Sequence, residues 1–165
     1  MTEGAGEGDG SFLELLAVHQ GLFDLLVSHQ EALLARDFRR AVELLLELRR
    51  RFEQHVAAEE ELFTKLFSEV DQVRGTPLDL FTGEHKHLRE MLASFESATR
   101  ALDVADARTP RRVIDLVEEE ALFKSFFRHH DERERNLLYP AFDAGMHGSE
   151  RREMLRKFHV GQPPA

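Results

Sequence analysis

Apolar residues recur every three or four positions along most of the chain, which is the spacing that places side chains on one face of an α-helix. Residues 12–34 contain the first apolar stripe, and a second stripe follows a turn at Arg36 and Asp37, where Asp37 can cap the next helix. The first half of the chain is therefore expected to form two helices. The first stripe consists of Phe12, Leu15, Leu16, His19, Leu22, Phe23, Leu26 and Leu33, and the second of Leu44, Leu45, Leu48, Phe52, His55, Glu59, Leu62, Phe63 and Leu66.

Two Thr-Pro pairs predict where the next two helices begin. Thr76 and Pro77, which follow Gly75, form the first pair, and Thr109 and Pro110 form the second. In each pair we expect threonine to be the N-cap and proline to occupy the first helical position. The third stripe consists of Phe81, His85, Leu88, Leu92 and Phe95, and the fourth of Leu116, Phe123, Phe127, His130, Glu134, Leu137, Leu138 and Ala141.

The end of the chain holds one shorter amphipathic segment. Pro140 is expected to kink the fourth helix near its end, and Gly145 to close it. Residues 150–158 should then pack back as a short helix. The sequence contains no strand pattern, Gly-rich phosphate loop or long linker. The predicted fold is all-α, an up-down-up-down four-helix bundle with a short C-terminal helix.

The length of 165 residues is that of one ordinary domain. We expect residues 1–10 to form a flexible N-terminal tail, residues 11–145 to form the bundle, and residues 146–165 to form the short C-terminal helix and its tail. Apolar residues make up 42% and charged residues 32%, a balance typical of soluble helical proteins. A cytoplasmic location is expected, because the N-terminus lacks basic and apolar signal regions and no run of about 18 apolar residues occurs.

The formal net charge of -9 argues against nucleic acid or an anionic membrane as the main partner, because both attract positive surfaces. Small ligands or metal cations suit this charge better. The chain has no cysteine, which excludes disulfides, zinc-thiolate sites and iron-sulfur clusters. Any metal must therefore be held by nitrogen and oxygen atoms. We expect a monomer or a weak homodimer.

Each of the four stripes contains a histidine where an apolar residue would be expected, and two of these histidines are followed four residues later by a glutamate. That spacing places both side chains of each pair on the same patch of the core. Burying unpaired carboxylates would cost several kcal/mol each, about as much as a domain's stability when summed. A pair of divalent cations would compensate. The candidate metal ligands are His19, His55, Glu59, His85, His130 and Glu134.

A single His-x-x-x-Glu pair on a charged helix usually forms a surface ion pair, which contributes little. Here two such pairs lie on apolar stripes, and two further histidines lie on the other stripes. The combination favours a buried metal site over a set of surface ion pairs.

Several sequence motifs resemble the hemerythrin-like family, in particular its branch called HHE cation-binding domains. The similarity covers about residues 12–143. Its most specific part is the last motif, which ends in Leu-Tyr-Pro. The motifs are His19, His55-Val-Ala-Ala-Glu59, Glu84-His85 and His130-x-x-x-Glu134-x-x-x-Leu138-Tyr139-Pro140.

The resemblance implies a bundle that encloses two iron ions joined by an oxo or hydroxo bridge. The same ligand types also accept zinc or manganese. By this resemblance, His19 and His55 serve one iron, His85 and His130 serve the other, and Glu59 and Glu134 bridge the two.

The sequence departs from classical oxygen carriers of the family at Arg89, which stands where they have a fifth histidine. With four histidines, both irons keep an open position, which favours activation or reduction of dioxygen, peroxide or nitric oxide over reversible storage. The family resemblance leaves open whether the protein is a di-iron oxidoreductase or a module that binds or senses oxygen or iron. A structural bundle that scaffolds a partner is a third reading.

Other histidines are expected to lie outside the site. His29 is ten residues beyond His19, too far along a helix to share its metal, and is expected at an edge or on the surface. His87 should point away from His85 and be exposed. The phase of the surrounding apolar residues favours His130 over His129 as the core-facing residue.

Two further residues have alternative interpretations. Glu60 is expected to face solvent, or to orient one of the histidines. Tyr139 is expected to pack in the core, with a phenol directed at the iron as the alternative.

Overall fold

The computed structural model describes residues 10–67, 72–73 and 76–159. The described residues are almost all helical, which confirms the all-α class. A 3-10 turn, Phe12–Leu15, precedes the first helix, and a π-helical turn, Glu134–Leu138, joins α4 to α5. A short antiparallel pair, β1 (Gln72–Val73) and β2 (Thr76–Pro77), precedes α3. The helices are α1 (Leu16–Leu34), α2 (Phe38–Leu66), α3 (Leu78–Arg100), α4 (Thr109–Arg133), α5 (Tyr139–Gly145) and α6 (Gly148–His159).

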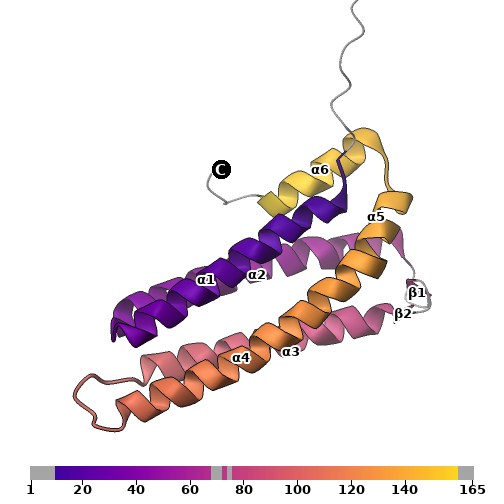
Figure 1. Ribbon diagram of the computed structural model, residues 1–165. Coiled ribbons are helices and arrows are strands. Elements are labelled where there is room, and N and C mark those ends of the chain that lie inside the picture. The colour runs from indigo at the N-terminus through magenta and orange to yellow at the C-terminus, as the bar shows by residue number, and fades with distance from the viewer. Residues whose placement is uncertain (1–9, 68–71, 74–75, 160–165) are drawn as a thin grey trace, which may run out of the picture.

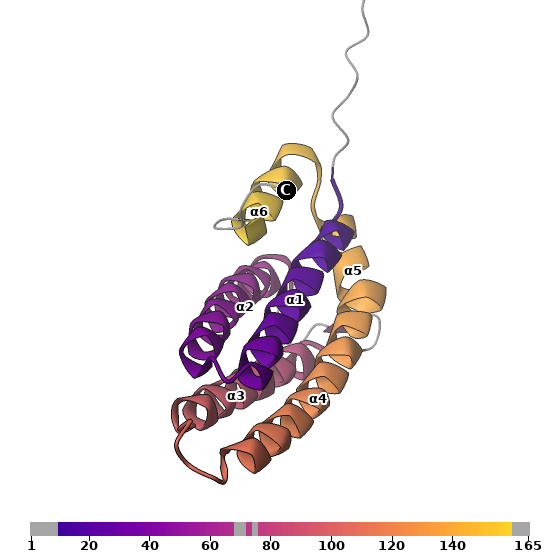
Figure 2. The same ribbon diagram turned by 60° about the vertical axis from the view of Figure 1, so that its left-hand side comes forward.

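The long helices α1 to α4 lie side by side (Figures 1 and 2). α1 packs against α2, α2 against α3, α3 against α4, and α4 against α1. α5 continues α4 beyond the π-helical turn, and α6 turns back to pack against α2. The 3-10 turn at the start of α1 contacts α5. Of the predicted N-terminal tail, residues 1–10, only Gly10 is among the described residues, and residues 160–165 at the other end lie outside them.

The helix starts follow the sequence signals only in part. Asp37 is the N-cap of α2 and accepts a hydrogen bond from the backbone N–H of Arg40 at 3.0 Å, as predicted. The prediction for Thr76 was wrong, because Pro77 takes the N-cap position of α3 and Thr76 lies in β2. Thr109 is the first residue of α4 and not its N-cap; its hydroxyl donates to the carbonyl of Asp103. Gly75 lies outside the described residues.

The irregularity expected near Pro140 is a π-helical turn. The backbone N–H of Tyr139 bonds to the carbonyl of Glu134, five residues back. Pro140 follows at once and has no N–H to offer to the carbonyl four residues earlier, so the ordinary ladder is interrupted there. The helix then ends at Gly145, as predicted. The wider turn brings Glu134 and Tyr139 to the same side.

The interior consists of two apolar clusters with a polar layer between them. One cluster includes Phe52, Phe123 and Phe127, and the other includes Phe63 and Phe158. The histidine rings of the polar layer contact both clusters. The ring contacts are His19 with Phe127 at 5.5 Å, His130 with Phe127 at 6.1 Å, His85 with Phe63 at 6.2 Å and His55 with Phe158 at 5.4 Å between centroids.

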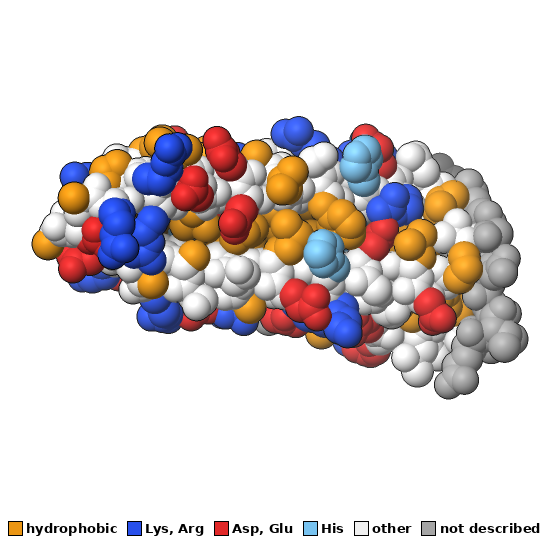
Figure 3. Space-filling view, turned by 90° about the horizontal axis from the view of Figure 1, so that it is seen from below, with side chains coloured by type: hydrophobic (Ala, Val, Ile, Leu, Met, Phe, Trp, Pro, Cys, Tyr) orange, Lys and Arg blue, Asp and Glu red, His pale blue; other side chains and the backbone are white. Residues whose placement is uncertain are grey.

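The outward helix faces carry closely spaced opposite charges. Arg49 of α2 pairs with Glu96 of α3, and Arg89 of α3 pairs with Glu53 of α2 at 2.9 Å. Figure 3 shows acidic and basic side chains on both sides of a band of apolar ones. In the part of the chain that the structure describes, no helix is both long enough and apolar enough to cross a membrane.

Candidate metal centre

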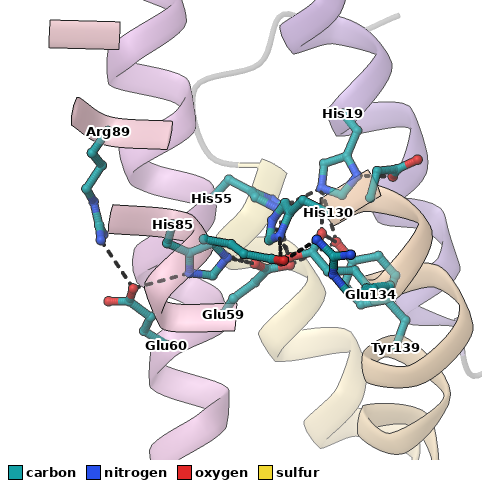
Figure 4. A network of polar contacts seen from close by, with 12 residues as sticks. His19, His55, Glu59, Glu60, His85, Arg89, His130, Glu134 and Tyr139 are labelled. Atoms are coloured by element: carbon teal, nitrogen blue, oxygen red, sulfur yellow. Dashed lines mark hydrogen bonds and ion pairs between the residues drawn. The ribbon is translucent and has the colours of Figure 1, made fainter. Parts of the chain in front are cut away.

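The structure brings all six predicted ligands into one buried layer between the helices (Figure 4). None of the six is more than 2% exposed. Their ligand atoms form two groups, and within each group all atoms lie within 4.8 Å of one another. Glu59 and Glu134 belong to both groups. The first group adds His19 and His55, and the second adds His85 and His130.

In the first group, the Nε2 atoms of His19 and His55 lie 2.8 Å apart. Nε2 of His55 is 3.1 Å from Oε1 of Glu59, and Nε2 of His19 is 3.4 Å from Oε2 of Glu134. Both imidazoles therefore direct the same ring nitrogen to the same point, where each also meets a carboxylate oxygen.

In the second group, Nε2 of His85 is 3.3 Å from Oε2 of Glu59 and 3.5 Å from Oε1 of Glu134. Nε2 of His130 is 2.8 Å from Oε1 of Glu134. Each glutamate therefore turns one oxygen to the first group and its other oxygen to the second. This is the arrangement that a carboxylate needs to bridge two cations.

In three of the four histidines, the ring nitrogen that points away from the centre, Nδ1, contacts a carboxylate. Because a carboxylate can only accept, Nδ1 of each of these rings carries a proton, and a ring that gives up its other proton turns the lone pair of Nε2 inward. Neutral imidazole in this tautomer is the form that binds metals. The pairs are His19 with Asp131, His85 with Glu60 at 3.2 Å and His130 with Glu84 at 2.8 Å.

Each of these outer carboxylates is also paired with an arginine. Figure 4 shows one such series, in which Arg89 contacts Glu60 and Glu60 contacts His85. The arginines balance the charge of carboxylates that would otherwise be costly to bury. The contacts are Arg89 with Glu60 at 3.3 Å, Arg133 with Glu84, and Arg135 with Asp131 at 3.0 Å.

The phenol of Tyr139 lies inside the centre. Its hydroxyl is 2.8 Å from Oε1 of Glu59, 3.1 Å from Oε2 of Glu134 and 3.1 Å from Nε2 of His19. Burial raises the pKa of Tyr139 well above its usual value, and the two glutamates raise it further. The hydroxyl therefore keeps its proton and acts as a hydrogen-bond donor to the carboxylates.

The charges in the layer shift the pKa values of its groups in opposite directions. Burial acts to lower the pKa of both His85 and His130, but neighbouring carboxylates, Glu134 foremost, outweigh it and raise these values to about 11 and about 9. Burial acts to raise the pKa of Glu134 and Glu59, and the imidazoles overcome it, so both values lie below normal. Without a cation, the negative charge of the buried glutamates is balanced by protons bound to the imidazoles.

The residues fit divalent cations. Nδ1 of His55 and Oε2 of Glu59 are buried without a hydrogen-bond partner among the residues that the structure describes. Oε2 of Glu59 lies 3.3 Å from Nε2 of His85. The two groups attract each other by charge at this distance, but their atoms do not have hydrogen-bond geometry. Imidazole nitrogens and carboxylate oxygens suit first-row metals such as iron, zinc and manganese. Their role as metal ligands stays a prediction.

The other predictions have mixed outcomes. His130 is buried, and His129 has a side chain 65% exposed, which supports the choice of His130 as the inward residue. His87 is exposed, as predicted. Glu60 does hold His85. Of the two alternatives for Tyr139, the structure favours the phenol that points into the centre.

The prediction that His29 lies on the surface was wrong. His29 is fully buried, its Nδ1 donates to the carbonyl of Ala41 at 2.8 Å, and its Nε2 is 2.8 Å from Oε1 of Glu120. Glu120 comes from α4 and also accepts from Gln30 at 2.9 Å. The buried partner on the neighbouring helix α4 explains why a histidine so far from the centre is also inside.

No role was predicted for two carboxylates of the site, Asp131 and Glu84, although Glu84 stands in the Glu84-His85 motif. Asp131 holds His19, and Glu84 holds His130 and contacts Arg133. The acidic residues directly beside His85 and His130 were the available signal, since an acidic residue next to a ligand histidine can reach the back of a histidine on a neighbouring helix.

The structure is that of a helical domain with two buried groups of His and Glu side chains, which share both carboxylates and could each hold a metal ion. The family model described as the hemerythrin HHE cation binding domain matches residues 13–142. The chain belongs to this family. No curated protein and no solved structure shows significant similarity to it.

Proposed function

We propose that this chain is a non-heme di-iron protein that acts on a small oxidant, namely dioxygen, peroxide or nitric oxide. The observation that carries the proposal is the division of each shared carboxylate between two ligand groups. We also propose that α1 to α4 follow an up-down-up-down order around the centre, and that the protein is a monomer or a weak homodimer. The ligands would be His19 and His55 on one iron, His85 and His130 on the other, and Glu59 and Glu134 on both.

Two ferrous ions can together supply two electrons to one bound molecule. The chain provides no fifth histidine, because Arg89 stands at that position and is occupied with Glu53 and Glu60. Fewer protein ligands leave coordination positions for the oxidant. The absence of that histidine supports redox chemistry over storage.

The residues around the centre have distinct tasks in this proposal. The hydroxyl oxygen of Tyr139 lies 2.8 Å from Oε1 of Glu59, and its proton is available for a hydrogen bond to a ligand bound beside it. Phe127 and Phe63 cover the histidines on both sides and keep bulk water away. The outer carboxylates fix the direction of three imidazoles.

The alternative function is a module that binds or senses oxygen or iron without turnover. The full burial of the six ligands favours this alternative in one respect, because the centre has little room for a large substrate. A small diatomic ligand would fit either function.

The experiment that tests the proposal is anaerobic mixing of the reduced, iron-loaded protein with dioxygen, hydrogen peroxide or nitric oxide. In the presence of an excess of a chemical reductant, each chain should consume several molecules of at least one of these oxidants. Stopped-flow absorption measures this consumption. A stable dioxygen adduct that reverses under vacuum would instead support the binding module. An iron-loaded protein that reacts with none of the three would refute the proposal.

A further inference from the structure

The two histidines of the second ligand group are both anchored from behind. Nδ1 of His130 is 2.8 Å from Oε2 of Glu84, a side chain only 6% exposed. Nδ1 of His85 is 3.2 Å from Oε1 of Glu60. Each ring is therefore fixed in its orientation and in the tautomer that turns a lone pair on Nε2 inward.

The first ligand group has only one such anchor. His19 is held by Asp131, but Nδ1 of His55 is buried with no hydrogen-bond partner in the described ranges. In place of a carboxylate, the His55 ring packs against Phe158 of α6, with ring centroids 5.4 Å apart. Nothing polar in that contact selects the tautomer or raises the basicity of the ring.

The arginines do not offset this difference, because each of the three outer carboxylates has one. Their effect on the three anchored histidines is therefore similar, and His55 differs from all of them. The arginines are Arg89 beside Glu60, Arg133 beside Glu84 and Arg135 beside Asp131.

We propose that the two metal positions are unequal: the His85–His130 position binds a cation first and tightly, and the His19–His55 position binds the second cation weakly and exchanges it. This inference rests on the proposed function, since it assumes that the six ligands hold two cations. Loss of a carboxylate behind a ligand histidine commonly weakens metal binding about tenfold to hundredfold. The absence of one behind His55 should separate the two steps by a similar factor.

The cover over His55 is the short helix α6, which carries none of the six predicted ligands. α6 is tied to α2 by ion pairs between Lys65 and Glu150 at 2.6 Å and between Lys157 and Glu61 at 2.5 Å. The four side chains of these pairs are 41–52% exposed, so each pair contributes little to stability. α6 is held chiefly by Met154, Leu155 and Phe158, which are buried in the second apolar cluster.

The test is an anaerobic titration of the metal-free protein with Co²⁺, followed by the visible absorption of the bound ion. The wild-type protein should show two steps whose dissociation constants differ by about tenfold or more. His55→Ala should keep the tight step and lose the weak one, whereas His130→Ala should lose the tight step. Two steps of equal affinity, or loss of the tight step in His55→Ala, would overturn the inference.

A matched pair of variants tests the positioning residues. Glu84→Gln should weaken the tight step about tenfold or more and leave the weak step in place, and Asp131→Asn should weaken only the weak step. A merely structural role would weaken both steps together in either variant, and that result would also count against the inference.

If circular dichroism shows that either variant does not fold, limited chelation of the Co²⁺-loaded wild-type protein replaces the titration of that variant. One Co²⁺ should then leave well before the other, and simultaneous loss of both would contradict the proposal. A folded wild-type protein that binds no Co²⁺ and no Fe²⁺ would refute the proposed function itself, which distinguishes that failure from two equal sites.

Discussion

The hydroxyl of Tyr139 donates to Oε1 of Glu59 at 2.8 Å, from a residue five positions beyond Glu134 on the far side of the π-helical turn. Tyr139→Phe keeps the ring but removes the donor from two buried carboxylates. We expect the metal-free protein to lose about 1–3 kcal/mol of unfolding free energy, the usual cost of leaving a buried polar group unpaired. Urea unfolding followed by circular dichroism measures it.

The same variant should still bind its full complement of iron, because the phenol is not among the predicted ligands. Unchanged stability of metal-free Tyr139→Phe would show that the hydroxyl contributes nothing to holding the carboxylates.

His29→Ala should destabilise the protein without removing metal. The substitution leaves Glu120 buried without its imidazole partner, and breaking a buried pair in this way costs about 3–5 kcal/mol. Adding Glu120→Gln should restore part of the loss, because the uncompensated charge is then gone. Thermal unfolding and iron content, measured on the same preparations, check both parts. Loss of iron from folded His29→Ala would place His29 in the metal centre after all.

Gly83→Ala should stabilise the protein by about 0.5–1 kcal/mol, the usual gain from replacing a helical glycine. An added Cβ at Gly83 in α3 would meet no heavy atom within 4 Å. Gly10→Ala is the contrasting variant, because Gly10 has φ +68° and its added Cβ would lie 2.9 Å from Leu155. Urea unfolding should move in opposite directions for the two variants. Destabilisation by Gly83→Ala would indicate that this part of α3 changes conformation.

Metal binding at pH 7 should release about two protons per chain. In the metal-free protein, His85 and His130 have pKa values of about 11 and about 9, so both carry an extra proton that the metal must displace. Calorimetric titration with Fe²⁺ or Co²⁺ in buffers of different ionisation enthalpy measures the release. A heat that does not depend on the buffer would contradict the prediction.

The direction in which pH changes the stability of the metal-free protein follows from the raised pKa values of His85 and His130. Protonation of His85 and His130 stabilises the metal-free fold fully below their unfolded pKa of about 6.5. This contribution is lost progressively as the pH rises from there to about 9 for His130 and to about 11 for His85. The unfolding free energy of the metal-free protein should therefore fall over that range, and the metal-loaded protein should be less affected.

The faces of the helices were predictable because helical phase alone decides them. His19, His55 and His85 share the phase of the leucines and phenylalanines around them, so their burial follows from spacing. The choice of His130 over His129 followed from Phe127 in the same way. Glu59 lies one turn beyond His55, so its burial required no knowledge of the other helices.

The partners across helices could not be predicted, because they depend on how two helices are rotated and aligned. Asp131 reaches His19 only through the packing of α4 against α1, and Glu120 reaches His29 through the same pair of helices. The place of Tyr139 depends on the π-helical turn, which a regular helical period does not anticipate.

The iron content of protein purified from iron-supplied cells tests most directly whether the buried histidines and glutamates hold metal. The wild-type chain and the control variant His129→Ala should each carry about two iron ions, because the side chain of His129 is exposed. His130→Ala should lose most of its iron. A folded wild-type protein without iron, or equal iron content in the two histidine variants, would contradict the metal centre.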